Sequence, residues 1–161
     1  AMAQIAGDFS QFTQTPERDQ TNVDLRNLLK EAHAAYPHAS LLLPREGEWT
    51  VLANEEQLLR VINNLLNNAF ESVESGLKAM VSFGLRQEES QVHIFVRDNG
   101  SGIPKHRMEQ IFEPKFTTKS RGTGLGLAIV KAIVESFHGR IWVEESSDAG
   151  TEFVFSLPLK G

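Results

Sequence analysis

Hydrophobic positions along the chain follow helical spacing in some segments and strand-like alternation in others. Three segments predict helices: 25–36 after an N-cap at Asp24, 55–74 after a capping-box pattern of Asn54 and Gln57, and 124–137. Strand-like runs lie at 21–23, 40–44, 49–53, 77–87, 91–98, 139–146 and 151–158. Because helices and strands do not alternate strictly, we expect an α+β fold: a two-layer α/β sandwich whose mixed, mostly antiparallel sheet is covered by helices on one face.

The first segment of the chain has a helical pattern of its own. Met2, Ile5, Phe9 and Phe12 recur at helical spacing, and Pro16 ends that pattern. We therefore divide the chain into a short helix over 1–15, a linker over 16–20 and one main domain over 21–158.

Composition narrows the class of protein. With 161 residues and 40% hydrophobic content, the chain is long enough for one domain with a core. A net charge of −5 does not favour nucleic-acid binding, and the absence of cysteine excludes disulfides and thiolate metal sites. No apolar run reaches the roughly 20 residues that a membrane-spanning helix needs, so we expect no membrane contact by this chain.

The predicted helix over 55–74 carries asparagines beside its buried stripe. At about 100° per residue, Asn64, Asn68 and Glu71 share one flank, whereas Asn67 points away from the core and is expected in solvent. Asn64 and Asn68 are either ordinary polar boundary residues or ligands whose amide oxygens face a pocket. Oxygen ligands of this kind suit Mg²⁺, which takes few protein ligands and keeps several waters.

A second candidate lies at the end of the strand-like run 91–98. Asp98 is followed by Gly100 and Gly102, which let the backbone turn sharply and approach a flat ligand. Its carboxylate is able to accept a hydrogen bond from an exocyclic amine such as that of adenine, whereas guanine would present a carbonyl there. The alternative is a loop aspartate with turn glycines.

The segment before the third predicted helix combines cations with glycines. Phe112 and Phe116 are candidate anchors of a loop whose Lys115, Lys119 and Arg121 are able to reach phosphates, although a solvated charged loop fits the same pattern. Gly122, Gly124 and Gly126 then lead into the helix. Its free N-terminal amides form an anion site, and the glycines let phosphate oxygens approach them. The turn lacks the lysine and spacing of a P-loop.

These stretches stand in one order: NNLLNNAFES, DNGSGIP, FEPKFTTK and GTGLGLAIV. That order resembles the four sequence boxes of the ATP-binding catalytic domain of sensor histidine kinases, in the wider ATPase family shared with gyrase and MutL. The resemblance covers about residues 20–158. It implies the Bergerat-type ATP-binding fold, with ATP and Mg²⁺ as ligands and the adenine between the sheet and the helices.

The resemblance also implies roles for single residues. Asn68 resembles the Mg²⁺-coordinating asparagine, with Asn64 as its helper, and Asp98 resembles the adenine-binding aspartate. Thr151 resembles the threonine that supports the adenine pocket through water. The turn beneath the base corresponds to Gly100, Gly102 and Ile103. The phosphate-binding residues, in and after an ATP lid over 104–121, correspond to Lys115, Lys119, Arg121, Gly122, Thr123, Gly124, Leu125, Gly126 and Leu127.

Two places depart from patterns found in the wider family. Asn64 stands where ATPase relatives such as gyrase hold a glutamate that serves as base, and an amide does not take up a proton usefully. We therefore expect slow hydrolysis of bound Mg-ATP. Glu71 and Ser72 stand where many members carry a lysine and an aromatic residue near the phosphates and the adenine.

The resemblance places this chain within a longer kinase. None of its histidines is followed by an acidic residue, as the phosphoacceptor of such kinases is. We expect a catalytic fragment of a cytoplasmic or membrane-anchored homodimer, with 1–15 as the tail of the dimerisation hairpin. Its partners would be the histidine-bearing dimerisation domain and a response-regulator receiver domain. The alternatives are a regulatory ATP-binding module without transfer activity, an ATPase gate, and a serine kinase of the anti-sigma type.

Overall fold

A five-stranded sheet forms one layer of the molecule. The computed structural model describes residues 20–114 and 126–160. Within them the strand order is β2–β4–β5–β7–β6, where β2 pairs parallel to β4 and the other neighbours pair antiparallel. The strands are β2 (Ser40–Leu42), β4 (Ser82–Glu88), β5 (Gln91–Arg97), β6 (Arg140–Ser147) and β7 (Gly150–Pro158).

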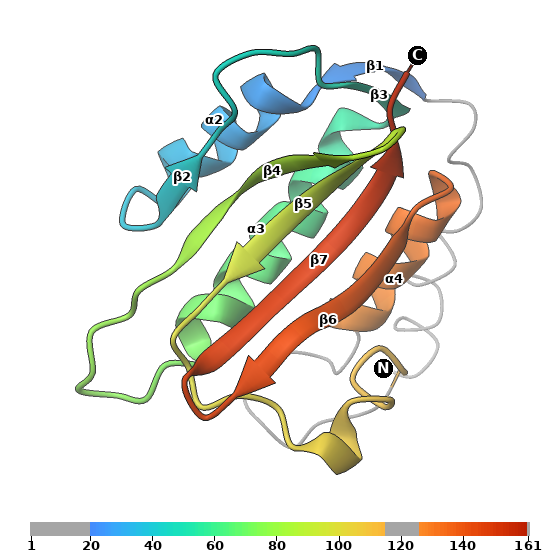
Figure 1. Cartoon of the computed structure of the whole chain (residues 1–161). Helices are drawn as coiled ribbons and strands as arrows, with labels where there is room; N and C mark the ends of the chain where they lie inside the picture. The colour runs from blue at the N-terminus through green and yellow to red at the C-terminus, as the bar shows by residue number, and fades with distance from the viewer. Residues whose placement is uncertain (1–19, 115–125, 161) are drawn as a thin grey trace.

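Three helices form the second layer, and all of them lie on the same face of this sheet (Figure 1). They are α2 (Leu25–Ala35), α3 (Glu55–Glu71) and α4 (Gly126–Ser136). A separate antiparallel pair, β1 (Thr21–Asp24) and β3 (Thr50–Ala53), lies beside them. The main core fills the space between the layers, with Phe83, Ile94 and Phe155 contributed by the sheet. The expected two-layer sandwich is confirmed.

The helix starts follow the capping signals in the sequence. The Asp24 side chain accepts a hydrogen bond from the backbone N–H of Arg26 at 2.9 Å and opens α2. The Asn54 side chain accepts one from Gln57 N–H, also at 2.9 Å, and opens α3. Each cap satisfies an amide that has no partner inside its helix.

The end of α3 differs from the expectation. The helix ends at Glu71, three residues before the expected Glu74, because the Ser72 hydroxyl donates to the Ala69 carbonyl at 2.7 Å and caps the last turn. Val73 consequently lies outside the helix and is half-buried, whereas Leu66 joins the buried face.

The start of β4 also differs. Strand pairing begins at Ser82 and not at Leu77, so Leu77 and Met80 stay exposed. Asn99 holds this segment away from the sheet: its side-chain oxygen accepts from Met80 N–H at 2.7 Å, and its amide donates to the Lys78 carbonyl at 2.9 Å. These side-chain bonds replace the ladder bonds that a longer strand would make.

Other expectations fall outside the described part of the chain. The helix over 1–15 and most of the linker lie there, as does the start of the third helix before Gly126. Residues 99–114 lie in a loop with one short 3₁₀ turn, η1 (Lys105–Arg107). Over 20–114 and 126–160, no helix has both the length and the apolar character needed to cross a bilayer.

Candidate functional site

Asp98 lies directly after β5, beside the first residues of β7. Its Oδ1 accepts two backbone hydrogen bonds, from Gly100 N–H at 2.8 Å and from Thr151 N–H at 3.2 Å. Since both of these bonds go to Oδ1, the backbone leaves Oδ2 as the acceptor for a ligand. The two bonds therefore hold the carboxylate in one orientation.

The environment of Asp98 perturbs its titration. Burial raises the pKa of this carboxyl above its ordinary value, and hydrogen bonds from Gly100 N–H, Thr151 N–H and the Ser72 hydroxyl offset part of that rise. A half-buried carboxylate whose pKa is raised by desolvation is typical of a functional site.

Thr151 connects this aspartate to the β6–β7 hairpin. The residue is buried, and its hydroxyl lies 2.9 Å from the Ser146 hydroxyl. Ser146 Oγ also accepts a hydrogen bond from Ile103 N–H at 2.9 Å. The loop that contains Gly102 and Ile103 is therefore fixed to the hairpin that supplies Thr151. Ser146 was not among the expected site residues, because its position opposite Thr151 depends on the register of β6 and β7.

The two glycines after Asp98 are required by packing of the chain itself. A Cβ at Gly100 would lie 2.2 Å from Ser72 Oγ, and a Cβ at Gly102 would lie 2.1 Å from the Ser147 carbonyl oxygen. Gly102 also has a φ of +85°, which favours glycine. Close approach of other protein atoms thus accounts for both glycines, whether or not a ligand lies over them.

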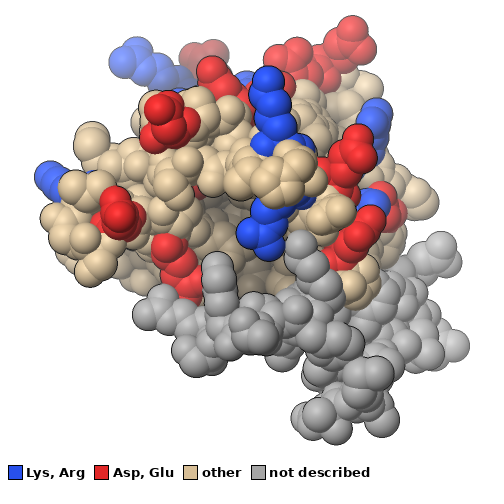
Figure 2. Space-filling model, turned by 90° about the horizontal axis from the view of Figure 1, so that it is seen from below, with Lys and Arg blue, Asp and Glu red and all other residues tan. Residues whose placement is uncertain are grey.

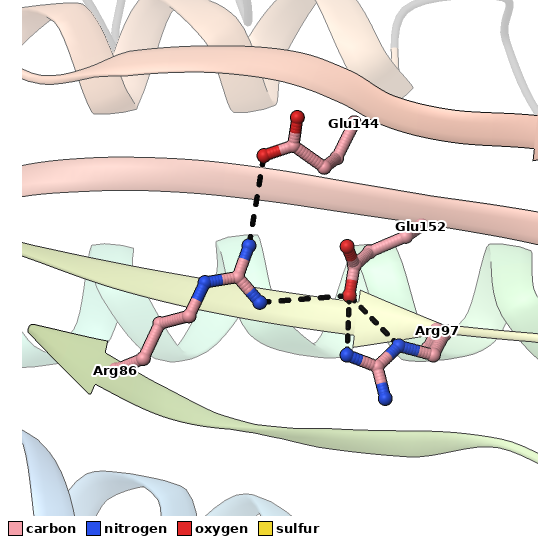
Figure 3. Close-up of polar contacts among 4 residues, drawn as sticks. All are labelled: Arg86, Arg97, Glu144 and Glu152. Carbon is pink, nitrogen blue, oxygen red and sulfur yellow. Dashed lines mark hydrogen bonds and ion pairs between the residues drawn. The ribbon is translucent and has the colours of Figure 1, made fainter. Parts of the chain in front are cut away.

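A charged pair fixes β5 to β7 next to these residues (Figure 3). Arg97 precedes Asp98 and Glu152 follows Thr151, and the two are directly paired across the strands. Arg97 Nε and Nη2 lie 2.8 and 2.7 Å from Glu152 Oε2, and Arg86 Nη1 lies 3.6 Å from the same oxygen. Glu152 is nearly buried, with 8% of its side chain exposed. Sequence analysis missed this pair, although opposite charges flanking both site residues were a possible signal.

The same arginines cover an aromatic ring on the helix-free face of the sheet. The guanidinium carbons of Arg97 and Arg86 lie 4.8 and 5.3 Å from the centre of the Phe95 ring. Phe95 is consequently buried although no described helix packs on it. Because Arg86 belongs to β4 and Phe95 belongs to β5, this packing adds a contact between those two strands.

Asn64 and Asn68 lie one helical turn apart on α3, so the two side chains share one flank of the helix. Asn64 and Asn68 are half-buried, and Asn67 is exposed. Asn64 Nδ2 donates to the Arg60 carbonyl at 3.0 Å, which leaves its amide oxygen available. Asn64 also lines a hollow of about 890 Å³ along α3, together with Arg60 and Asn67.

This donor set fits Mg²⁺ better than a metal that prefers histidine or thiolate ligands. Two amide oxygens one helical turn apart supply neutral oxygen ligands, and Mg²⁺ completes its shell with water and phosphate oxygens. Over the described residues, no group of three or more His, Cys, Asp or Glu side chains is placed to hold a metal ion.

The phosphate side of the expected site is described only in part. Gly126 begins α4 and is exposed, and a Cβ there would meet no described atom within 4 Å. Leu127 is half-buried against the core. Phe112 packs edge-on against Phe153, with 6.2 Å between ring centres, and so anchors the segment before residue 115 to the core, as expected. The remaining candidates lie outside the described residues: Lys115, Phe116, Lys119, Arg121, Gly122, Thr123, Gly124 and Leu125.

Charged side chains of both signs surround this end of the molecule. Figure 2 shows lysines and arginines interspersed with aspartates and glutamates. The view contains no broad field of a single sign.

Comparison with known proteins connects this geometry to a family. Residues 53–161 match the model of the histidine kinase-, DNA gyrase B- and HSP90-like ATPases. The chain belongs to this family. Within it, the curated relatives are sensor histidine kinases, and the domain is therefore an ATP-binding catalytic domain of the histidine kinase type.

Individual relatives of this ATPase family cover most of the chain. The adaptive-response sensory kinase SasA of Rippkaea orientalis is 36% identical over 141 residues, which are 83% of this chain. The catalytic domain of histidine kinase ThkA has a TM-score of 0.74 at 28% identity, covering 87% of this chain and 95% of that one. ThkA in complex with the response regulator TrrA has a TM-score of 0.76 at 25% identity, covering 99% of this chain and 47% of that one. The chain spans 36% of the length of SasA.

Proposed function

We propose that this domain binds Mg-ATP and donates the γ-phosphoryl group to a histidine on a separate dimerisation domain of its parent kinase. The observation that carries the proposal is Asp98, whose carboxylate is fixed at the end of β5 by two backbone donors, both of them on Oδ1. A carboxylate oxygen in that place accepts a hydrogen bond from the exocyclic amine of adenine. The carbonyl of guanine would face it as a second acceptor, so guanine is disfavoured.

The side chains of α3 supply the metal end of the proposed site. Asn68 and Asn64 would hold Mg²⁺ through their amide oxygens on the flank that they share. When bound, the metal ion neutralises charge on the phosphates and bridges their oxygens. Gly126 and the residues before it would place backbone amides against those phosphates at the N-terminus of α4.

Asn64 favours transfer over hydrolysis. Its amide binds a metal or orients a water molecule but does not accept a proton at neutral pH, so no base at this position activates water. We expect slow phosphate release from ATP by the domain alone, measured with a coupled phosphate assay. Rapid release would favour an ATPase gate instead.

The same proposal specifies which groups receive the phosphoryl group. A histidine of the dimerisation domain would receive the phosphoryl group, and a response regulator would receive it in turn. The complex of the related ThkA with the response regulator TrrA supports a receiver domain as partner. Such relays operate in the cytoplasm, which is the location we propose for this domain.

Phosphotransfer in trans tests the proposal. The domain would be mixed with the separately produced dimerisation domain of its parent and radiolabelled Mg-ATP. We expect acid-labile label on a histidine, lost with Asn68→Ala. ATP binding with no labelled histidine would support the regulatory module, and absence of ATP binding would overturn the site itself.

A further inference from the structure

Ser146 connects three parts of the proposed adenine pocket. Its hydroxyl oxygen accepts a hydrogen bond from Ile103 N–H at 2.9 Å and lies 2.9 Å from the Thr151 hydroxyl. Thr151 N–H in turn donates to the Asp98 carboxylate at 3.2 Å. The Ser146 side chain therefore lies between the loop that follows Asp98 and the threonine that helps to hold Asp98.

The strand register places both hydroxyl groups on the helix-covered face of the sheet. Thr151 alternates along β7 with Phe153 and Phe155, which belong to the core between the sheet and the helices. Ser146 is directly opposite Thr151 in the pairing of β6 with β7, and residues that are directly opposite share a face. Ser146 is half-buried and Thr151 is buried. Both side chains thus lie on the face where we place the adenine.

The direction of these hydrogen bonds decides what Thr151 offers to a ligand. Ser146 has one hydroxyl proton, and because Ile103 N–H is itself a donor, only the Thr151 oxygen of these two partners is able to accept that proton. When Ser146 donates to Thr151, the Thr151 proton is available for an acceptor on the ligand. When Thr151 donates to Ser146, Thr151 offers the ligand only an acceptor.

Adenine requires a donor beside Asp98. On one edge of the base the exocyclic amine is a donor and the neighbouring ring nitrogen, N1, is an acceptor. An ionised carboxylate only accepts, so Asp98 binds the amine and has no proton for N1. Thr151 contacts the same carboxylate through its backbone, and its hydroxyl supplies the missing donor when Ser146 donates to it.

We infer that Ser146 is a positioning residue for adenine recognition, whose hydroxyl directs the Thr151 proton toward N1 of the base, either directly or through a bridging water molecule. The inference rests on the proposed function, in which Asp98 accepts from the adenine amine. Ser146 acts on N1 only through Thr151. Its other contact, with Ile103 N–H, fixes the loop and affects every nucleotide alike.

Two nucleotide analogues separate these two effects of Ser146. The analogue 1-deaza-ATP has C–H in place of N1 and keeps the amine, whereas 7-deaza-ATP keeps both groups. Titration calorimetry would measure the affinity of wild type and Ser146→Ala for ATP and for each analogue. We expect Ser146→Ala to lower the ratio of ATP affinity to 1-deaza-ATP affinity about three-fold, which is near the lower end for one ordinary hydrogen bond. The ratio of ATP affinity to 7-deaza-ATP affinity should not change.

The neighbouring Ser147 provides a matched control. This serine is exposed, and its hydroxyl accepts a hydrogen bond from Ala149 N–H at 3.1 Å inside the same hairpin. Its side chain points to the other face of the sheet from that of Ser146, because successive residues of a strand alternate. Ser147→Ala should leave both affinity ratios at their wild-type values.

A double variant tests the route through Thr151. Thr151→Val removes the hydroxyl and should lower the ratio of ATP affinity to 1-deaza-ATP affinity as Ser146→Ala does. Ser146→Ala added to Thr151→Val should lower the ratio no further, because the two residues act as one unit and their effects are not additive. Thermal unfolding would check that each variant is folded.

The contrary results distinguish the inference from the proposed function. An unchanged ratio in Ser146→Ala overturns the inference, and so does an equal loss of affinity for ATP and 1-deaza-ATP, which would leave Ser146 only its role in fixing the loop. A further fall in the double variant, or the same fall in Ser147→Ala, also overturns it. If Asp98→Asn binds ATP like wild type, the proposed site itself fails. Loss of ATP binding in Asp98→Asn, together with an unchanged ratio in Ser146→Ala, removes only the role of Ser146.

Discussion

Asp98 combines burial with a role that depends on its charge. Burial raises its pKa, and only the ionised form presents a free acceptor to the adenine amine. We predict that ATP affinity is constant near neutral pH and falls as the pH drops through the raised pKa. Calorimetry between about pH 8 and pH 4.5 would measure this change, with Asp98→Asn as the control that lacks it.

The unliganded domain should respond to pH in the opposite direction. A carboxyl whose pKa is higher in the folded than in the unfolded state binds more protons when folded, so its contribution to stability grows as the pH falls through the folded-state pKa. Protonation of Asp98 thus stabilises the empty domain and weakens the complex with ATP over the same pH interval. An ATP affinity independent of pH in wild type would contradict this assignment.

Single residues show how much of the candidate site could be predicted from the sequence alone. Asp98 and Asn64 were chosen by residue type and spacing, and Thr151 by resemblance to the family; the structure brings Asp98 and Thr151 into direct contact. Ser146 and Glu152 were not chosen, because the contact of Ser146 with Thr151 requires the register of β6 and β7, and the contact of Glu152 with Arg97 requires that of β5 and β7. A one-residue shift would turn each of these side chains to the other face of the sheet.

The Arg97–Glu152 pair belongs to the scale of elements, since it holds two strands together. Replacing Glu152 by Gln removes the charge that both arginines contact in a nearly buried place, and we predict a loss of about 1–3 kcal/mol in unfolding free energy. Glu144→Gln is the matched control: Glu144 is 46% exposed and lies 3.7 Å from Arg86, so its loss should stay within about 0.5 kcal/mol. Urea denaturation measures the unfolding free energy of both variants. Equal losses in Glu152→Gln and Glu144→Gln would show that burial of Glu152 does not strengthen its contribution.

The N-cap of α3 permits a prediction that concerns the stability of the fold and not nucleotide binding. Asn54→Ala leaves the Gln57 amide without its cap and should cost about 1 kcal/mol in unfolding free energy, whereas Asn54→Ser should retain most of it. Asn54 lines the same hollow as Asn64 but lies at the end of α3 away from Asn68, and we predict no change in ATP affinity. A parallel loss of affinity would show that the whole helix adjusts during binding.

Element boundaries mark where sequence patterns become insufficient. The starts of α2 and α3 followed from capping residues, since those signals are local. The end of α3 and the start of β4 did not, because they depend on the Ser72 hydroxyl and on Asn99, which contacts a segment about twenty residues earlier in the chain. A contact between distant segments thus overrides local propensity at the start of β4, whereas the end of α3 involves a side-chain bond within the last turn.

At the scale of the whole molecule, the fold class could be predicted but the strand order could not. The order of helices and strands indicated a sandwich with one covered face. The parallel addition of β2 beside β4, and the separation of β1 and β3 into their own sheet, arise from pairings between distant segments. Such pairings leave no periodic pattern in the chain.

Ligand binding to this single layered unit should stabilise it as a whole. If Mg-ATP binds only the folded state, a concentration of about 100 times its Kd adds about 2.7 kcal/mol to the unfolding free energy. We predict a rise in the midpoint of thermal unfolding with Mg-ATP and a smaller rise with ATP in excess EDTA. Identical midpoints with and without nucleotide would contradict binding to the folded domain.

The central claim is that Asp98 selects adenine within a magnesium-dependent nucleotide site. Titration calorimetry of wild type and Asp98→Asn with ATP, with and without Mg²⁺, and with GTP tests it most directly. We predict magnesium-dependent ATP binding by wild type, loss of that binding in Asp98→Asn, and no binding of GTP. Undiminished ATP binding by Asp98→Asn, or equal affinity for GTP, would contradict it.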